Sequence, residues 1–164
     1  MKTPEIDNSK LAEVKELIDK AATLMENQNG VRPPELDKVE SRLRELTGKP
    51  GLDAAQFREY WGWTSLDEAA KIALAPEPKK SGLSDEELTG IITKICKCEY
   101  SEAETDHYLK LLKLETGLKN ISNYIFYPNL VGLDMRADVP EIIAKILEDR
   151  KVYLFKLVSL SLNI

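Results

Sequence analysis

The segment SEAETDHYLKLLKLETG, residues 101–117, carries a complete set of helix-forming features. Ser101 and Glu104 form the Ser-x-x-Glu pattern of a capping box, in which each side chain accepts a hydrogen bond from the other residue's backbone N–H. Tyr108 and the leucines after it recur at three- and four-residue spacing, which is typical of a helix with one buried face. Gly117 ends the pattern, because glycine readily adopts the left-handed conformation found after many helices. The segment therefore predicts one amphipathic helix with two defined ends.

A similar order of features occurs in the first half of the chain. The stretch LRELTG at residues 43–48 corresponds to LKLETG at residues 112–117. Two further pairs follow in the same order: Glu59-Tyr60-Trp61 with Ile125-Phe126-Tyr127, and Ala70-Lys71-Ile72 with Ala144-Lys145-Ile146. The identity is weak and the spacing needs small insertions, so chance similarity between amphipathic helices is the alternative. The shared order of elements favours a tandem repeat.

Each half contains four candidate helical segments. In the first half these are a stripe over 11–24, a stripe over 36–46, a short helix or turn within 54–63, and a helix capped by Thr64 or Ser65. In the second half they begin at the Ser84–Glu87 capping box, at Ser101, at the aromatic cluster 124–128, and at Asp138 with Pro140. The proline-bearing stretch 75–82 predicts a linker.

The expected fold is all-α, with two related four-helix modules in tandem. The first module covers residues 1–78 and the second covers residues 83–150, leaving an apolar C-terminal tail at 151–164. The tail is compatible with a longer last helix, an added strand, or a cover over a groove between the modules.

Composition narrows the classes of function. Apolar residues make up 43% and charged residues 31% of the chain, as in ordinary globular proteins. A net charge of −5 provides no basic stripe for phosphate contacts, so no nucleic-acid partner is expected. No run of about 20 apolar residues and no secretory leader is visible, which predicts no membrane partner and a cytoplasmic location. The expected partner is another protein.

Catalytic and metal-binding patterns are weak. His107 follows Asp106, but adjacent helix positions diverge by about 100°, so the pair is not aligned as a base and its orienting group. Cys96-Lys97-Cys98 is closer spaced than the cysteine pairs of structural zinc sites, and Cys96 fits an apolar helix face. The glutamates 86, 87, 102 and 104 suit the first turns of helices, and an acidic patch for a basic partner is the alternative. We expect a protein that is not an enzyme and needs no cofactor or metal.

The stretch SNYIFYP at residues 122–128 is the most informative for function. Adjacent aromatic residues ahead of a proline cannot all point inward from one short turn, so one ring can anchor the core while its neighbour faces solvent. Exposed tyrosine is a preferred interface anchor, because it is large, rigid and amphipathic. The alternative is that all the rings belong to the core.

Here the chain resembles a known family. The order Ile95-Cys96, Ser101-Glu102, the 122–128 stretch, and then a helix from Val139 is similar to the immunity proteins of nuclease colicins and pyocins. The resemblance covers about residues 83–150. It implies a four-helix bundle with a short third helix, which neutralises a bacteriocin nuclease by binding beside its active site. In that family the second helix selects the toxin and an aromatic pair supplies shared binding energy.

The resemblance assigns roles to individual residues. Phe126 and Tyr127 match the aromatic pair, Pro128 the proline that follows it, and Asn123 an acidic position. The partner-facing side of the second helix corresponds to Glu102, Thr105, Asp106, Leu109, Lys110 and Lys113, and in the first module Tyr60 and Trp61 take the place of the aromatic pair.

Three positions depart from the family pattern. Phe126 lacks the usual hydroxyl, Asn123 is uncharged, and Lys113 reverses the usual negative charge. Lys113 would face a basic nuclease toxin, and like charges repel across an interface. These changes therefore favour an alternative function. In that alternative the chain is a non-catalytic adaptor or regulator that retains the immunity fold.

Overall fold

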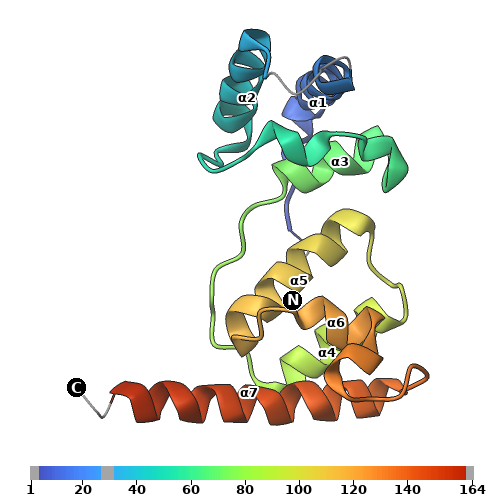
Figure 1. Ribbon diagram of the computed structural model, residues 1–164, viewed down its shortest axis with the longest axis vertical. Coiled ribbons are helices and arrows are strands. Elements are labelled where there is room, and N and C mark those ends of the chain that lie inside the picture. Colours follow the sequence, from blue (N-terminus) through green and yellow to red (C-terminus); the bar gives the residue numbers. More distant parts are fainter. Residues whose placement is uncertain (1–3, 27–31, 162–164) are drawn as a thin grey trace. The chain divides into compact units, whose positions relative to one another are not determined.

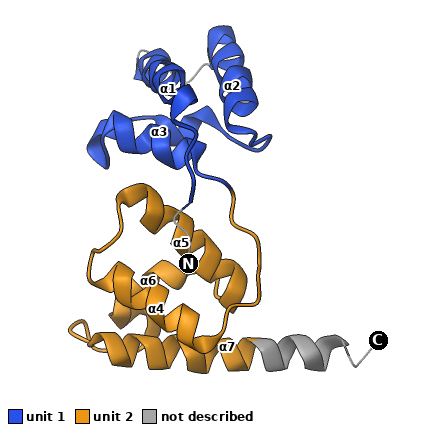
Figure 2. Cartoon of the chain, turned by 180° about the vertical axis from the view of Figure 1, so that it is seen from behind, with its two compact units in different colours: residues 1–76 blue, residues 77–164 orange. Residues whose placement is uncertain are grey.

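The computed structural model describes residues 4–26 and 32–161, with side chains described through Tyr153. Over these residues the chain is all-α, with seven α-helices, four short 3₁₀ helices and no β-strand (Figure 1). The chain divides into two compact units, Met1–Pro76 and Glu77–Ile164 (Figure 2). The all-α prediction is confirmed, and each unit has its own hydrophobic core.

The first unit is built on three α-helices: α1 (Leu11–Glu26), α2 (Pro34–Thr47) and α3 (Leu66–Leu74). The segment in which a short helix or turn was expected contains two 3₁₀ helices, η2 (Ala54–Phe57) and η3 (Tyr60–Gly62), and a further one, η1 (Asn8–Lys10), precedes α1. Helix α1 packs against α2, α3 and η2. It buries Val14, Ile18, Ala21 and Ala22 of its apolar stripe, and the three leucines of the stripe are partly buried against the same core. Ser65, one of the two expected caps of α3, accepts a hydrogen bond from the Glu68 N–H.

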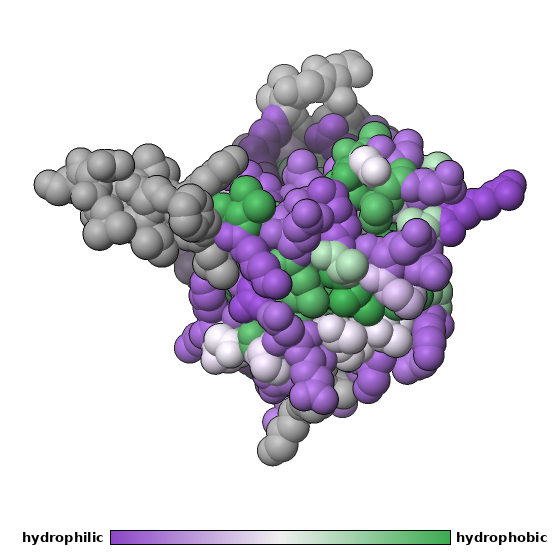
Figure 3. Space-filling model, turned by 90° about the horizontal axis from the view of Figure 1, so that it is seen from below, coloured by the Kyte–Doolittle hydropathy of each residue, from purple (hydrophilic) through white to green (hydrophobic). Residues whose placement is uncertain are grey.

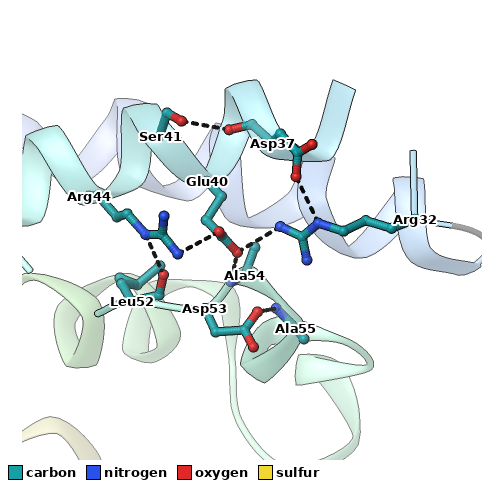
Figure 4. A network of polar contacts seen from close by, with 9 residues as sticks. All are labelled: Arg32, Asp37, Glu40, Ser41, Arg44, Leu52, Asp53, Ala54 and Ala55. Atoms are coloured by element: carbon teal, nitrogen blue, oxygen red, sulfur yellow. Dashed lines mark hydrogen bonds and ion pairs between the residues drawn. The ribbon is translucent and has the colours of Figure 1, made fainter. Parts of the chain in front are cut away.

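A buried carboxylate joins α2 to the turn that follows it. The Glu40 side chain is only 8% exposed, and its oxygens lie 2.6 Å from Arg44 Nη2 and 3.0 Å from Arg32 Nη2 (Figure 4). The same carboxylate accepts a 2.8 Å hydrogen bond from the N–H of Ala54, the first residue of η2. Two guanidinium groups and one backbone donor thus compensate the burial of this charge.

The second unit contains four α-helices: α4 (Asp85–Cys96), α5 (Glu102–Thr116), α6 (Ile121–Phe126) and α7 (Val139–Ser161). A 3₁₀ helix, η4 (Pro128–Val131), follows α6. Both expected capping boxes are present, at Ser84–Glu87 and Ser101–Glu104. Asp138 and Glu141 exchange equivalent 2.9 Å hydrogen bonds at the start of α7, which confirms the expected opening of that helix.

A second buried carboxylate holds the end of the expected linker. Glu115 of α5 is 1% exposed and accepts hydrogen bonds from the N–H groups of Ser81, Gly82 and Leu83 at 2.6–3.2 Å, and one from the Ser81 hydroxyl at 3.1 Å. Residues 81–83 therefore belong to the second unit, although the sequence places Ser81 and Gly82 in the linker. The linker seen in the structure is shorter than 75–82.

The backbone of α7 continues as helix through Ser161. Of the three possibilities left open for residues 151–164, the longer last helix is therefore found up to that residue, and residues 162–164 lie outside the described part of the chain. Among the described residues, no helix is both long enough and apolar enough to cross a membrane.

Candidate functional site

The aromatic corner of the second unit lies where α6 ends and η4 begins. Helix α6 has only six residues, and it turns Ile121, Tyr124 and Ile125 into the core. The hydroxyl of Tyr124 donates a 2.8 Å hydrogen bond to Asp149 Oδ2 of α7. Burial, together with the neighbouring Asp149 carboxylate, raises the pKa of Tyr124 to about 12. Tyr124 is thus the ring that anchors this corner.

Phe126 and Tyr127 face solvent instead. Their exposed fractions are 46% and 57%, so neither ring belongs to the core, whereas Pro128 immediately after them is buried. The Tyr127 N–H donates to Asn123 O at 3.0 Å, and the Leu130 N–H donates to Tyr127 O at 2.9 Å. Backbone hydrogen bonds on both sides therefore order the turn that carries the two rings.

Leu130 is an exposed apolar residue that the sequence analysis did not single out. It is 64% exposed and lies in η4, one turn after Phe126 and Tyr127. The same loop carries Met135, which is 59% exposed. Pro128 is the residue in the sequence that could have indicated this position. Proline favours the first turn of a helix, so the residues after it are expected to form a turn close to the aromatic pair.

The six residues assigned to the partner-facing side of α5 are exposed or partly exposed, but Leu109 also packs against the core of the second unit. Glu102 and Lys113 are exposed, while Thr105, Asp106, Leu109 and Lys110 are partly exposed. The core-facing side of the helix carries the buried Tyr108, Leu111, Leu112, Glu115 and Thr116. Helix α5 lies beside α6 within the second unit (Figure 1). The α5 face and the aromatic corner thus come from neighbouring elements.

Most charges on the α5 face have partners of opposite charge within the helix or serve its capping. Lys110 Nζ lies 2.9 Å from Asp106 Oδ2, one turn away. Glu104 caps the helix through the Ser101 N–H at 2.9 Å. The exposed Glu102 at one end and Lys113 at the other have opposite signs, and Asn123 near the corner is neutral. The face therefore has mixed charge and is not strongly acidic.

The corner of the first unit differs in which ring is exposed. Tyr60 is 9% exposed, and its hydroxyl donates a 2.9 Å hydrogen bond to Asp19 Oδ1 of α1. Burial and this hydrogen bond raise the pKa of Tyr60 above its usual value. Trp61 packs edge-on against Tyr60, with ring centroids 5.3 Å apart, and is 51% exposed. Of the two aromatic residues assigned here, only Trp61 exposes its ring to solvent; Trp63, which the resemblance does not assign to the site, is 53% exposed.

The weak catalytic and metal-binding patterns gain no support from the geometry. Cys96 is partly buried against the second core, and Cys98 follows the end of α4 with a positive φ of 54°. The His107 ring lies edge-on to Tyr108, with centroids 5.5 Å apart. Within the described ranges, no group of three or more His, Cys, Asp or Glu residues is placed to hold a metal ion.

No protein-family model, curated protein or solved structure gives a significant match to this chain. The resemblance to the colicin and pyocin immunity proteins therefore rests on the residues of this chain alone.

Proposed function

We propose that this chain is a non-catalytic bacteriocin immunity protein that binds and neutralises a nuclease-type toxin domain. The observation that carries the proposal is that neighbouring residues at the end of α6 differ in burial. Tyr124 and Ile125 are buried, while the adjacent Phe126 and Tyr127 are about half exposed. A protein stabilised only by its core has no need to hold two large aromatic rings in solvent on an ordered turn.

The proposed mode of action is steric. Phe126, Tyr127 and Leu130 form the apolar centre of the contact, because aromatic side chains on a rigid turn lose little conformational entropy on binding. The outward face of α5, from Glu102 to Lys113, provides polar contacts around this centre and so determines which toxin is bound. Neither part requires a cofactor or a covalent step.

We further propose that the two units are related four-helix modules, the first with 3₁₀ turns in place of its third helix. Two equivalent helix ends support this. The Thr47 hydroxyl donates to Leu43 O at 2.7 Å, and the Thr116 hydroxyl donates to Leu112 O at the same distance. Gly48 and Gly117 follow in the left-handed conformation, with φ of 67° and 75°. Each unit then places a buried tyrosine, Tyr60 or Tyr124, ahead of an exposed aromatic ring.

The direct test is binding of the purified chain to nuclease domains of bacteriocins, measured by calorimetry. Tyr127→Ala should weaken a complex by about 2 kcal/mol or more, roughly a 30-fold rise in Kd, if the ring is a central anchor. Trp63→Ala is the matched control, because its ring has a similar exposed fraction and lies on the other unit. Equal, small effects of both substitutions would remove Tyr127 from the interface.

An adaptor or regulator that binds a different protein is the second candidate, and the charge of the α5 face favours it. The Asp106–Lys110 ion pair and the exposed Lys113 leave little excess negative charge for a basic nuclease. Salt dependence separates the two candidates, since a charge-steered immunity complex associates much faster at low salt. Tight binding to a non-toxin partner, together with no binding to any nuclease domain, would select the adaptor.

A further inference from the structure

An apolar groove lies on a different part of the second unit, between α4 and the first half of α7. Its volume is about 650 Å³, within the roughly 300–1,000 Å³ typical of ligand pockets. The lining comes from Thr89 and Thr93 of α4, from Lys97 directly after that helix, and from Val139, Pro140, Ile143, Ala144 and Leu147 of α7. Figure 3, a view onto the face that α7 crosses, shows apolar side chains exposed among hydrophilic ones. This face can therefore bind apolar side chains of another molecule.

The same helix carries a segment of matching chemistry. After Lys151 the sequence VYLFKLVSLS, residues 152–161, contains a single charged residue, Lys156, and the backbone is helical throughout. Consecutive helix positions differ by about 100°, so this run places apolar residue types on every side of the helix axis. A helical segment with apolar residue types on every side favours burial against another surface.

Sequence spacing puts the groove and this segment on one stripe of α7. Leu154 follows Leu147 by seven residues, and Val158 follows Lys151 by seven, which is the interval that keeps a common helix face. The groove residues of one α7 and the apolar segment of another therefore match in an antiparallel pair. Pairing that is the same in both directions gives a closed dimer with two-fold symmetry, the commonest symmetry among soluble oligomers.

The charges near the centre of such a pair are also complementary. Two charged residues near the centre have partners within their own unit. Asp149 contacts Tyr124 and Lys145. Arg150 forms an ion pair with Asp85. Glu148 and Lys151 are left exposed. With Ala144 of one copy opposite Leu154 of the other, Glu148 lies near Lys151 of the other copy, and the methylene stem of Lys151 covers Leu147.

We propose that the occupant of the α4–α7 groove is a second copy of this chain. In each copy, the apolar segment of α7 after Lys151 binds in the groove of the other copy. This interface is independent of the aromatic corner, so it can form whether or not the chain binds a toxin.

The experiment is sedimentation equilibrium of the full chain over a wide concentration range. The unmodified chain should form a dimer. Ala144→Glu, at an exposed groove position, and Leu154→Glu should each raise the dimer dissociation constant by at least about tenfold, because each places a charge in an apolar contact. Ala12→Glu, at an exposed alanine of α1, is the matched control and should leave the dimer intact. Circular dichroism confirms that each variant is folded.

A double variant tests the antiparallel register. Ala144→Glu combined with Leu154→Lys should restore most of the dimer, because the new charges are then opposite in sign and face each other across the interface. A chain that remains monomeric at several hundred micromolar would overturn the proposal. So would dissociation by Leu154→Glu without any effect of Ala144→Glu, since the apolar segment would then associate outside the groove. Failure of the double variant would overturn the register.

Discussion

Both units bury a glutamate, and they compensate the buried charge by different chemistry. Glu40 of the first unit lies between Arg32 and Arg44, whose side chains are 44% and 40% exposed. Glu115 of the second unit is surrounded by the backbone N–H groups of residues 81–83. Water can solvate the two arginines if their partner is lost, but it reaches the buried Leu83 N–H poorly. The loss of Glu115 should therefore cost more than the loss of Glu40.

The largest expected effect follows from that difference. Glu115→Ala should destabilise the second unit by about 3 kcal/mol, because several backbone donors lose a charged acceptor at once. Glu40→Ala should destabilise the first unit by about 1–2 kcal/mol, mostly because the Ala54 N–H loses its acceptor. Native-state hydrogen exchange reports the two units separately, through core amides such as Leu112 and Leu43. Equal losses in the two units would contradict the comparison.

The pH dependence of the second unit tests the same carboxylate with a smaller change. Burial raises the pKa of Glu115, but the hydrogen bonds from Ser81, Leu83 and Gly82 outweigh it and hold the pKa below 4.5. A group with a depressed pKa in the folded state stabilises the fold above its unfolded pKa, and this stability is lost as the pH falls through the folded pKa. The second unit should therefore lose stability below about pH 4.5.

Glu115→Gln should remove part of that loss, because an amide does not titrate. Glu86→Gln, at an exposed position in the first turn of α4, is the control. Hydrogen exchange of α5 amides between pH 6 and pH 3 makes the measurement. An unchanged pH dependence in Glu115→Gln would show that other carboxyl groups account for it.

The two equivalent helix ends provide a third contrast. Gly48 and Gly117 both have a positive φ, so alanine is strained at either position, by about 1 kcal/mol. A Cβ at Gly48 meets open space, whereas a Cβ at Gly117 collides with the ring of Tyr153. Gly117→Ala should therefore cost about 2 kcal/mol. In a Tyr153→Ala background, the cost of Gly117→Ala should fall to that of Gly48→Ala. If Gly117→Ala still costs more in that background, the collision with the Tyr153 ring is not the cause of the difference.

The buried tyrosines should show the smallest effects. Tyr124→Phe and Tyr60→Phe each remove one hydrogen bond to a carboxylate, with an expected cost of about 1 kcal/mol. Tyr60→Phe should be the milder change, because Asp19 lies at an exposed position where water can replace the hydroxyl. Hydrogen exchange in the two units compares them directly. A larger loss for Tyr60→Phe would mean that Asp19 depends on this contact.

The sequence by itself determined the helices and most of their ends. Capping boxes at Ser84 and Ser101, the serine cap of α3, and glycines 48 and 117 act through backbone groups a few residues away, so they operate whatever the tertiary fold. The buried stripes of α1 and α2 were predictable for the same reason, since helical periodicity is local.

Only the tertiary structure decided which aromatic rings face solvent and where the linker ends. The sequence places Tyr60 and Trp61 together, yet Asp19 of α1 holds Tyr60 in the core and leaves Trp61 outside. Asp149 of α7 does the same for Tyr124, while Phe126 and Tyr127 remain exposed. Glu115 binds residues 81–83 from more than 30 positions away, so no local pattern could assign Ser81 and Gly82 to the second unit. In each case the deciding partner lies on another helix, and packing alone brings the two together.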